Sequence, residues 1–207
     1  MKYNFDGKGL TETPAIVYET QNLTELSLYN NQITEIPERL FIHDTLEVLN
    51  YAGNNIEMLS EEVGRLVHLR MLDLGLPDSI TQISSLRELH VYGNHLISLP
   101  EHLGALEELR VLDANDNRLT ELPPSLGKLG KLRRLSFRKN KISQLPEEIG
   151  ALDNLIELDL RDNLLRDLPD SILRLERLEK LDLRWNHHLQ TNENLEQLEQ
   201  RGCIVYR

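Results

Sequence analysis

The chain has 207 residues, a formal net charge of −11 and only 5% aromatic residues, so its core must be mostly aliphatic. The excess of negative charge disfavours contact with the phosphates of nucleic acids and with anionic membrane surfaces, and we expect neither as a partner. No apolar run is long enough to cross a bilayer, the first residues show no signal peptide, and the single cysteine, Cys203, cannot form an internal disulfide.

One pattern, L-x-x-L-x-L-x-x-N-x-L-x-x-L-P, recurs along the chain, as in "LTELSLYNNQITEIP" and "LRRLSFRKNKISQLP". Its first leucines are Leu23, Leu46, Leu69, Leu86, Leu109, Leu132, Leu155 and Leu178. Six of the seven intervals between them are 23 residues long, and the interval from Leu69 to Leu86 is 17. A fixed period of this length predicts a stacked array, because one repeat cannot bury its leucines alone but neighbouring repeats can.

The phase of the pattern extends beyond these repeats toward the N-terminus. Tyr3 and Phe5 precede Leu26 and Leu28 by 23 residues, which indicates a partial repeat at the start of the chain. We therefore expect a single repeat domain over residues 1–207. Its expected parts are an N-terminal partial repeat that acts as a cap (1–22), eight repeats of which the third is six residues short (23–189), and a C-terminal cap (190–207).

Each repeat predicts a short strand, a turn and a return segment, in that order. The stretch x-L-x-L-x alternates apolar and polar residues, as in a strand with one buried face. Stretches such as "PEEIGALDN" (146–154) are too short and polar for independent helices and predict helical or 3₁₀ return segments. The turn is expected at a recurring asparagine, whose amide can satisfy backbone groups that would otherwise be buried unpaired. These asparagines are at positions 31, 54, 94, 117, 140, 163 and 186.

These residues resemble the leucine-rich repeat family, in particular the 23-residue class with L-P-x-x-I-G-x-L on its return segment. "LPEEIGAL" (145–152) matches that segment fully, and "LPEHLGAL" (99–106) and "LPPSLGKL" (122–129) match it with leucine in place of isoleucine. The resemblance covers essentially the whole chain. It implies an α/β fold, a right-handed horseshoe-shaped solenoid with a concave parallel β-sheet and convex helical or 3₁₀ segments. It also implies a binding function, because known members mostly bind other proteins, although a shared fold does not by itself define function. The class of repeat also resembles bacterial members of the family, which implies a bacterial source.

The third repeat, "LRMLDLGLPDSITQISSL" (69–86), lacks six residues of the pattern, including the asparagine. Its strand must pass almost directly into its return segment, with Gly75 at the junction. One interpretation is a deletion that the stack tolerates, and the other is a functional notch that re-aims the two halves of the concave sheet. Both predict a weak point, because a missing core side chain destabilises a fold unless its neighbours close the gap.

The side chains between the strand leucines are expected to face the concave side. There His90 adjoins Asp113, and Ser136 lies one strand further, roughly 9–10 Å from His90 at the usual strand spacing. That separation is too long for a nucleophile and its base, so we expect no catalytic residue and no enzyme. Asp159 and Asp182 lie on an open face without a closed cleft, so we expect no metal and no cofactor there.

Two concave surfaces are candidate partner sites, and the alternative for both is an ordinary solvated surface. The C-terminal candidate combines a basic column with two carboxylates and a tryptophan, and arginine and tryptophan often dominate binding energy. Its residues are Arg134, Arg138, Arg161, Arg184, Trp185, Asp159 and Asp182. The N-terminal candidate is an apolar patch that straddles the short repeat, with His90 beside it. Its residues are Tyr29, Val48, Met71 and Tyr92.

The C-terminal stretch "TNENLEQLEQRG" predicts an amphipathic helix with Leu195 and Leu198 inward, which covers the end of the stack. Cys203 is expected to be buried beside this helix. Ile204 and Tyr206 keep the period of 23 residues after the last full strand, which predicts a final half-strand with both side chains pointing inward.

The sequence therefore predicts a non-enzymatic module that binds another protein or a peptide on its concave face, as a monomer or a weak dimer. The alternative is a structural or substrate-recruiting subunit, including an effector secreted without a signal peptide, that works with a separate catalytic chain. We expect the protein in the cytoplasm, with secretion by a route that uses no signal peptide left open.

Overall fold

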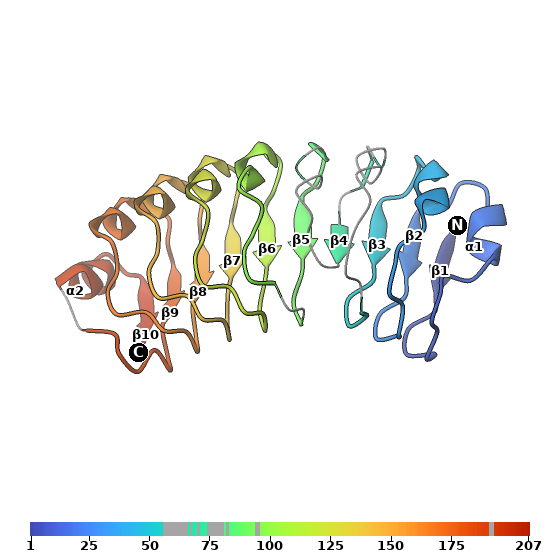
Figure 1. Ribbon diagram of the computed structural model, residues 1–207. Coiled ribbons are helices and arrows are strands. Elements are labelled where there is room, and N and C mark those ends of the chain that lie inside the picture. Colours follow the sequence, from blue (N-terminus) through green and yellow to red (C-terminus); the bar gives the residue numbers. More distant parts are fainter. Residues whose placement is uncertain are drawn as a thin grey trace.

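The computed structural model places short strands side by side in one parallel sheet, in the order of the sequence (Figure 1). It describes residues 1–55, 66, 68–69, 71–73, 81, 83–93, 96–190 and 193–207, with the backbone alone at 71–73. The strands are β1 (Lys2–Asn4), β2 (Glu25–Ser27), β3 (Val48–Asn50), β4 (Met71–Asp73), β5 (Glu88–His90), β6 (Val111–Asp113), β7 (Arg134–Ser136), β8 (Glu157–Asp159), β9 (Lys180–Asp182) and β10 (Ile204–Tyr206). β1 to β9 lie where the repeating pattern predicts strands.

The register of the sheet follows the leucine pattern from β1 to β9. Leu26 of β2 lies opposite Leu49 of β3, and the same position pairs from strand to strand as far as Leu181 of β9. β4 pairs directly with β5, so the sheet continues across the short repeat. The expected junction at Gly75 lies outside the described residues.

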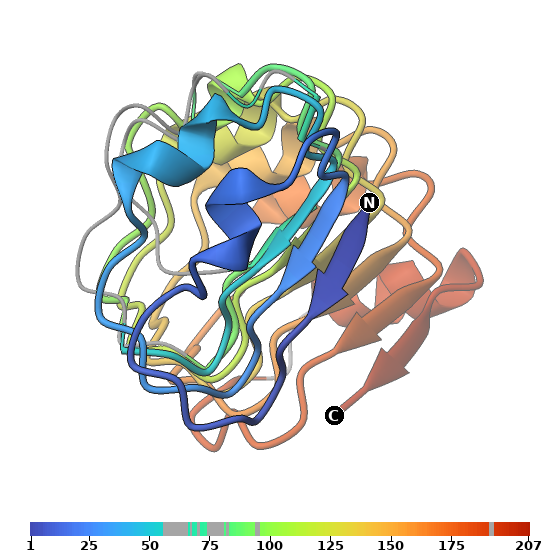
Figure 2. The same ribbon diagram turned by 90° about the vertical axis from the view of Figure 1, so that its right-hand side faces the viewer.

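The return segments are short 3₁₀ helices along one edge of the array, and all but η4 follow a proline with extended backbone (Figure 1). They are η1 (Glu38–Ile42), η4 (Leu103–Ala105), η5 (Pro124–Lys128), η6 (Glu147–Ala151) and η7 (Asp170–Arg174). Viewed along the array, the strands form one wall of the cross-section, and the return segments and loops close the rest of the ring (Figure 2). This is the predicted α/β horseshoe.

Two α-helices, α1 (Ile16–Glu19) and α2 (Glu193–Gln200), take the place of 3₁₀ segments near the two ends of the array. Leu195 and Leu198 of α2 are each 1% exposed and Cys203 is 6% exposed, so the amphipathic C-terminal helix is confirmed. Among the described residues no helix has the length and apolar character needed to cross a membrane.

A stack of aliphatic side chains fills the space between the sheet and the return segments. The first leucine of every repeat is buried, with at most 5% of its surface exposed. Phe137 and Tyr51 replace a leucine and are also buried. The Tyr51 hydroxyl lies 2.6 Å from the hydroxyl of Thr13, which satisfies the polar atom that this aromatic residue brings into the core.

The recurring asparagines join neighbouring repeats through the interior, as predicted. Asn163 is 4% exposed and donates from Nδ2 to the carbonyls of Leu160 at 3.0 Å and Phe137 at 2.9 Å. Its Oδ1 accepts from the N–H of Ile142 at 3.1 Å. Phe137 and Ile142 belong to the preceding repeat, so each asparagine ties two repeats together. The same pattern occurs at Asn31, Asn54, Asn117, Asn140 and Asn186, and Asn94 lies outside the described residues.

The last strand departs from the predicted register by one residue. β10 pairs Val205 with Leu181, so Ile204 and Tyr206 lie on the concave face, where they are 57% and 39% exposed. The prediction that both point inward is wrong. The segment before β10 contains α2 and a left-handed turn at Gly202 (φ 93°), and it makes this repeat one residue longer than the 23-residue repeats. A shift of one residue moves every side chain of a strand to the opposite face.

His43 follows η1, is 6% exposed, and gives the fold a predicted pH dependence. Burial lowers the pKa of His43 below 6.5, although a hydrogen bond with the Val17 backbone and the charge of Asp44 act in the opposite direction. Its Nε2 has no hydrogen-bond partner among the described atoms. The unfolded chain therefore takes up a proton at a higher pH than the folded chain. This contribution to stability is full above pH 6.5 and is lost as the pH falls toward the folded-state pKa.

We expect the free energy of unfolding to fall more steeply between about pH 7.5 and pH 5.5 in the wild type than in His43→Leu, which cannot titrate at this position. Urea unfolding at a series of pH values measures both slopes. The other histidines are common to both proteins and serve as the internal control. Equal slopes would show that His43 is not a source of the pH dependence.

Candidate functional site

A shallow groove of about 240 Å³ crosses the concave face from β5 to β9. Its lining comes from the first and third residues of successive strands, which flank the buried leucines. The charged and polar lining residues are Glu88, His90, Asp113, Arg134, Ser136, Glu157, Asp159 and Lys180, with Val111 among them. The groove therefore brings three of the predicted site residues into one depression: His90, Arg134 and Asp159.

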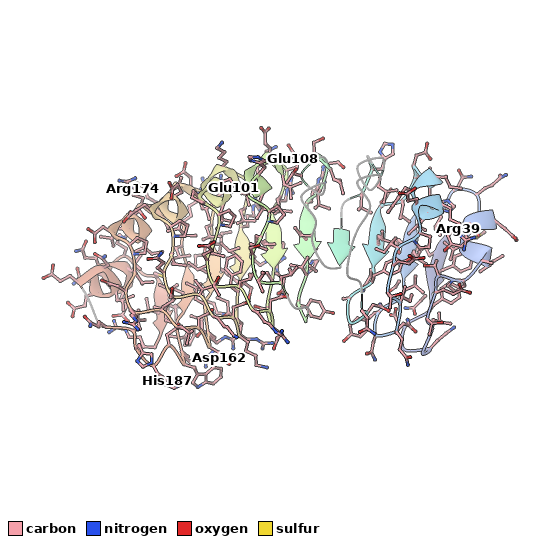
Figure 3. The ribbon with its side chains drawn as sticks, in the orientation of Figure 1. Arg39, Glu101, Glu108, Asp162, Arg174 and His187 are labelled. Carbon is pink, nitrogen blue, oxygen red and sulfur yellow. The ribbon has the colours of Figure 1, made fainter. Side chains whose placement is uncertain are left out.

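The residues just past the strands form a rim along one side of this face. Asp162 and His187 mark that rim in Figure 3, on the opposite edge of the array from Glu101 and Arg174. Trp185 occupies the same repeat position as Asp162, and both are exposed. The predicted residues Arg138, Arg161 and Arg184 precede this position and lie beside the groove.

Four of the predicted residues form a continuous ladder of ion pairs across β8 and β9. Arg161 Nε lies 2.9 and 3.1 Å from the two carboxylate oxygens of Asp159, and 3.4 Å from Asp182 Oδ2. Arg184 donates to both oxygens of Asp182, at 2.9 and 2.7 Å. The Asp182 side chain is 3% exposed, so the arginines cover its charge and present their own outer atoms to solvent.

The pKa values of this ladder keep it charged. Burial of Asp182 disfavours its ionised form, but hydrogen bonds from Arg184 and the charge of Arg161 outweigh burial and lower its pKa. The hydrogen bonds to Asp159 raise the pKa of Arg161. Asp182 and its two arginines therefore hold one another ionised at neutral pH, so this part of the ladder is a fixed electrostatic feature.

The third arginine of the basic column is paired in a different way. Arg138 Nη2 lies 2.8 Å from Asp116 Oδ2, and Lys139 Nζ lies 3.0 Å from the other oxygen of the same carboxylate. Hydrogen bonds from both cations lower the pKa of Asp116, against the effect of its burial. Arg138, Arg161 and Arg184 are therefore each compensated by an aspartate of this chain.

Arg134 and Lys180 are different, because neither forms an ion pair or a side-chain hydrogen bond with another described residue. Both are exposed at the first position of their strands, and Glu157 lies between them in the sheet. These side chains keep their full capacity to pair with a partner. Lys180 and Glu157 are groove residues that were not among the predicted site residues.

The N-terminal candidate patch is more dispersed than the C-terminal one. Tyr29 and Tyr92 follow β2 and β5, and β3 and β4 lie between them. Val48 is half-buried and pairs with Met71, whose side chain lies outside the described part of the chain. The described residues do not bring the two tyrosines together.

The central column of the concave face does not place Ser136 beside His90. Asp113 lies between His90 and Ser136 in the sheet, as predicted, so the histidine and the serine are two strands apart. His90 Nε2 is 3.4 Å from Glu88 Oε2 in its own strand. Within the described ranges no group of three histidine, cysteine or carboxylate side chains is placed to hold a metal ion.

Two concave residues escaped the sequence prediction because of the register shift. Tyr206 of β10 lies beside Arg184, whose guanidinium carbon is 5.1 Å from the centre of its ring, and the same carbon is 5.7 Å from the centre of the Trp185 ring. Ile204 occupies the same face of β10. The signal available in the sequence was the helical stretch before the strand, which interrupts the period of the pattern.

Three sequence profiles of one repeat family match the chain. They are described as "Leucine-rich repeat region" (residues 125–205), "Leucine rich repeat" (residues 21–75) and "Leucine Rich Repeat" (residues 108–129). These matches agree with the parallel register, the 3₁₀ return segments and the buried asparagines described above. The chain belongs to the leucine-rich repeat family.

Solved structures support the same fold. A leucine-rich repeat protein of Leptospira interrogans superposes with a TM-score of 0.71 at 28% identity, over 96% of this chain and 58% of that one. The ectodomain of the receptor kinase GASSHO1/SCHENGEN3 from Arabidopsis thaliana, in complex with CASPARIAN STRIP INTEGRITY FACTOR 2, gives 0.72 at 31% identity over 83% and 22%. The plant peptide hormone receptor RGFR1, in complex with RGF2, gives 0.73 at 26% over 89% and 32%.

The chain spans less than two thirds of the length of each of these proteins, from 22% to 58%. No curated protein sequence matches it.

Proposed function

We propose that this chain binds an extended segment of another protein, or a peptide, along the concave groove between β5 and β9. The groove carries the proposal, because it crosses successive strands and is lined by two exposed cationic side chains, Arg134 and Lys180, that have no compensating partner among the described residues. Their position among Glu88, Asp113 and Glu157 gives the groove a pattern of charges that selects partners by complementarity. Two similar plant receptors support this use of the fold, namely the GASSHO1/SCHENGEN3 ectodomain in complex with CASPARIAN STRIP INTEGRITY FACTOR 2 and the peptide hormone receptor RGFR1 in complex with RGF2.

The ion-pair ladder changes which substitutions can test the proposal. Reversing the charge of Arg161 or Arg184 removes one of the two cations that pair with the buried carboxylate of Asp182 and places a like charge beside it, so a loss of binding in such variants is confounded with a loss of stability. Arg134 and Lys180 avoid this problem, because they are exposed and unpaired with any described residue. Exposed substitutions of this kind usually change stability by about 0.5 kcal/mol or less.

The experiment is a selection of displayed random peptides on the wild-type chain, followed by titration of the selected peptides. We expect Arg134→Glu/Lys180→Glu to weaken their binding about tenfold or more, because each substitution replaces an attraction with a repulsion. The matched control is Lys128→Glu/Arg174→Glu, on the return segments η5 and η7, and it is expected to bind as the wild type does. A selection without binders, or binders that ignore the groove variant, would falsify the proposal.

A further inference from the structure

Trp185 stands at a backbone position that is unfavourable for tryptophan. The residue before each repeat asparagine adopts a left-handed conformation, with φ between 54° and 68° in the described repeats. The residues at this position are Asn30, Gly53, Gly93, Asp116, Lys139, Asp162 and Trp185. Glycine, asparagine and aspartate tolerate this conformation, whereas a bulky side chain there is an outlier.

Burial does not compensate for this conformation. Trp185 is 55% exposed, and its ring is contacted by Arg184 rather than enclosed by the core. A residue kept in an unfavourable conformation and left exposed points to a role outside folding. The other repeats show that the turn itself does not need an aromatic residue.

The surroundings of Trp185 form a surface suited to a large apolar side chain. Tyr206 contacts the same Arg184 guanidinium, and Ile204 lies on the same face of β10. Trp185 also lines a recess of about 290 Å³ together with Leu183, Leu189 and Leu195. Exposed aromatic residues next to arginine are typical of the few positions that dominate binding energy.

The charges at this end of the concave face favour an acidic partner. The Asp182 carboxylate is 3% exposed beneath Arg184, so the arginine is presented to solvent and the aspartate is not. Lys180 lies opposite Ile204 in the sheet and is unpaired among the described residues. Two cationic side chains therefore lie beside the exposed apolar residues at this end, Lys180 beside Ile204 and Arg184 beside Tyr206 and Trp185.

We infer that Trp185 is the anchor of the concave site, and that its occupant is a peptide segment of a partner protein in which a large apolar side chain is flanked by an acidic residue. The apolar side chain packs against Trp185 and Tyr206, and the carboxylate pairs with Lys180 or Arg184. This inference rests on the proposed function, because it specifies the chemistry of the segment that the groove receives.

The test uses Trp185→Asn and the same displayed random peptides. Asparagine occupies this position in the first repeat, as Asn30, and is compatible with the backbone. We expect binding to weaken about tenfold or more, since hot-spot residues carry that much affinity, while the melting temperature stays within about 3 °C of the wild type or rises. Lys139→Asn is the matched control at the same turn position, and it is expected to leave affinity within about twofold.

The selected sequences provide a second readout. We expect them to be enriched in aromatic or large aliphatic residues next to aspartate or glutamate, and depleted in lysine and arginine. Peptides that lose affinity for Arg134→Glu/Lys180→Glu but bind Trp185→Asn normally would overturn the anchor and leave the proposed function in place. Peptides that ignore both variants contradict both proposals. Selected sequences rich in basic residues overturn the inferred partner chemistry.

Discussion

Asn163→Ala is expected to lower the free energy of unfolding by about 2–3 kcal/mol, because it removes buried hydrogen bonds and leaves one buried backbone group without a partner. The N–H of Ile142 loses its acceptor, and the carbonyls of Leu160 and Phe137 each lose one of two donors but keep the amide of Asn186 or Asn140. A buried unpaired group costs about 1–3 kcal/mol, each lost hydrogen bond adds about 1 kcal/mol or less, and water that enters the space left by the amide offsets part of the total. Chemical denaturation followed by circular dichroism measures the loss.

Asn154→Ala is the matched control for that prediction. Asn154 also bridges neighbouring repeats, on both sides of its own, with its Nδ2 2.7 Å from the carbonyl of Gly130 and its Oδ1 2.8 Å from Nη1 of Arg177, but both bonds lie at the surface. Water replaces them when the side chain is removed, so we expect a loss of about 1 kcal/mol or less. If the two variants lose equal stability, burial is not what makes the repeat asparagine important.

Gly150→Ala is expected to cost about 2–3 kcal/mol through overpacking, since an added methyl group has no room between adjacent return segments. A Cβ at this position would lie 2.3 Å from the carbonyl oxygen of Ser171 and 2.7 Å from its Cβ. Gly150 is on η6 and Ser171 is on η7, so the two segments must move apart to accept the methyl group. The shift in the midpoint of chemical denaturation measures the effect.

Gly130→Ala tests whether the effect comes from the close approach rather than from loss of glycine. No atom lies within 4 Å of a Cβ built at Gly130. The same substitution there should leave stability within about 0.5 kcal/mol, or raise it slightly by reducing the freedom of the unfolded chain. A comparable loss at both glycines contradicts the packing explanation.

The repeating part of the fold was predictable because each repeat must bury the same leucines and satisfy the same backbone groups at its turn. The leucine at the centre of each strand, such as Leu112, must face the core, and the period of 23 residues brings the next leucine, Leu135, beside it. The asparagine was predictable for a similar reason, because the buried turn leaves backbone groups that only a side-chain amide can satisfy there. The glycine of the return segment belongs to the same pattern, although its reason, the contact with Ser171, is visible only in the structure.

The sequence predicted which charged residues lie in the candidate site, but it did not predict which of them pair with one another. The sequence placed Arg161 and Arg184 near Asp159 and Asp182 in adjacent columns, which left open whether the arginines bind a partner or these carboxylates. The conformations of the arginine side chains decide whether they pair with these carboxylates, and those conformations depend on all the surrounding residues in the folded chain. In the structure both arginines bind the aspartates, and the groove cations without a partner among the described residues are Arg134 and Lys180.

By itself, the sequence determined the repeat class, the strands, the buried leucines and the role of the asparagines. Each of these follows from residues that recur at the same positions in successive repeats. Only the tertiary structure decided the register of β10, and with it the exposure of Ile204 and Tyr206 on the concave face. The physical reason is that the faces of a strand depend on the length of the segment before it. α2 ends the repetition there, so the period no longer predicts which side chains turn inward.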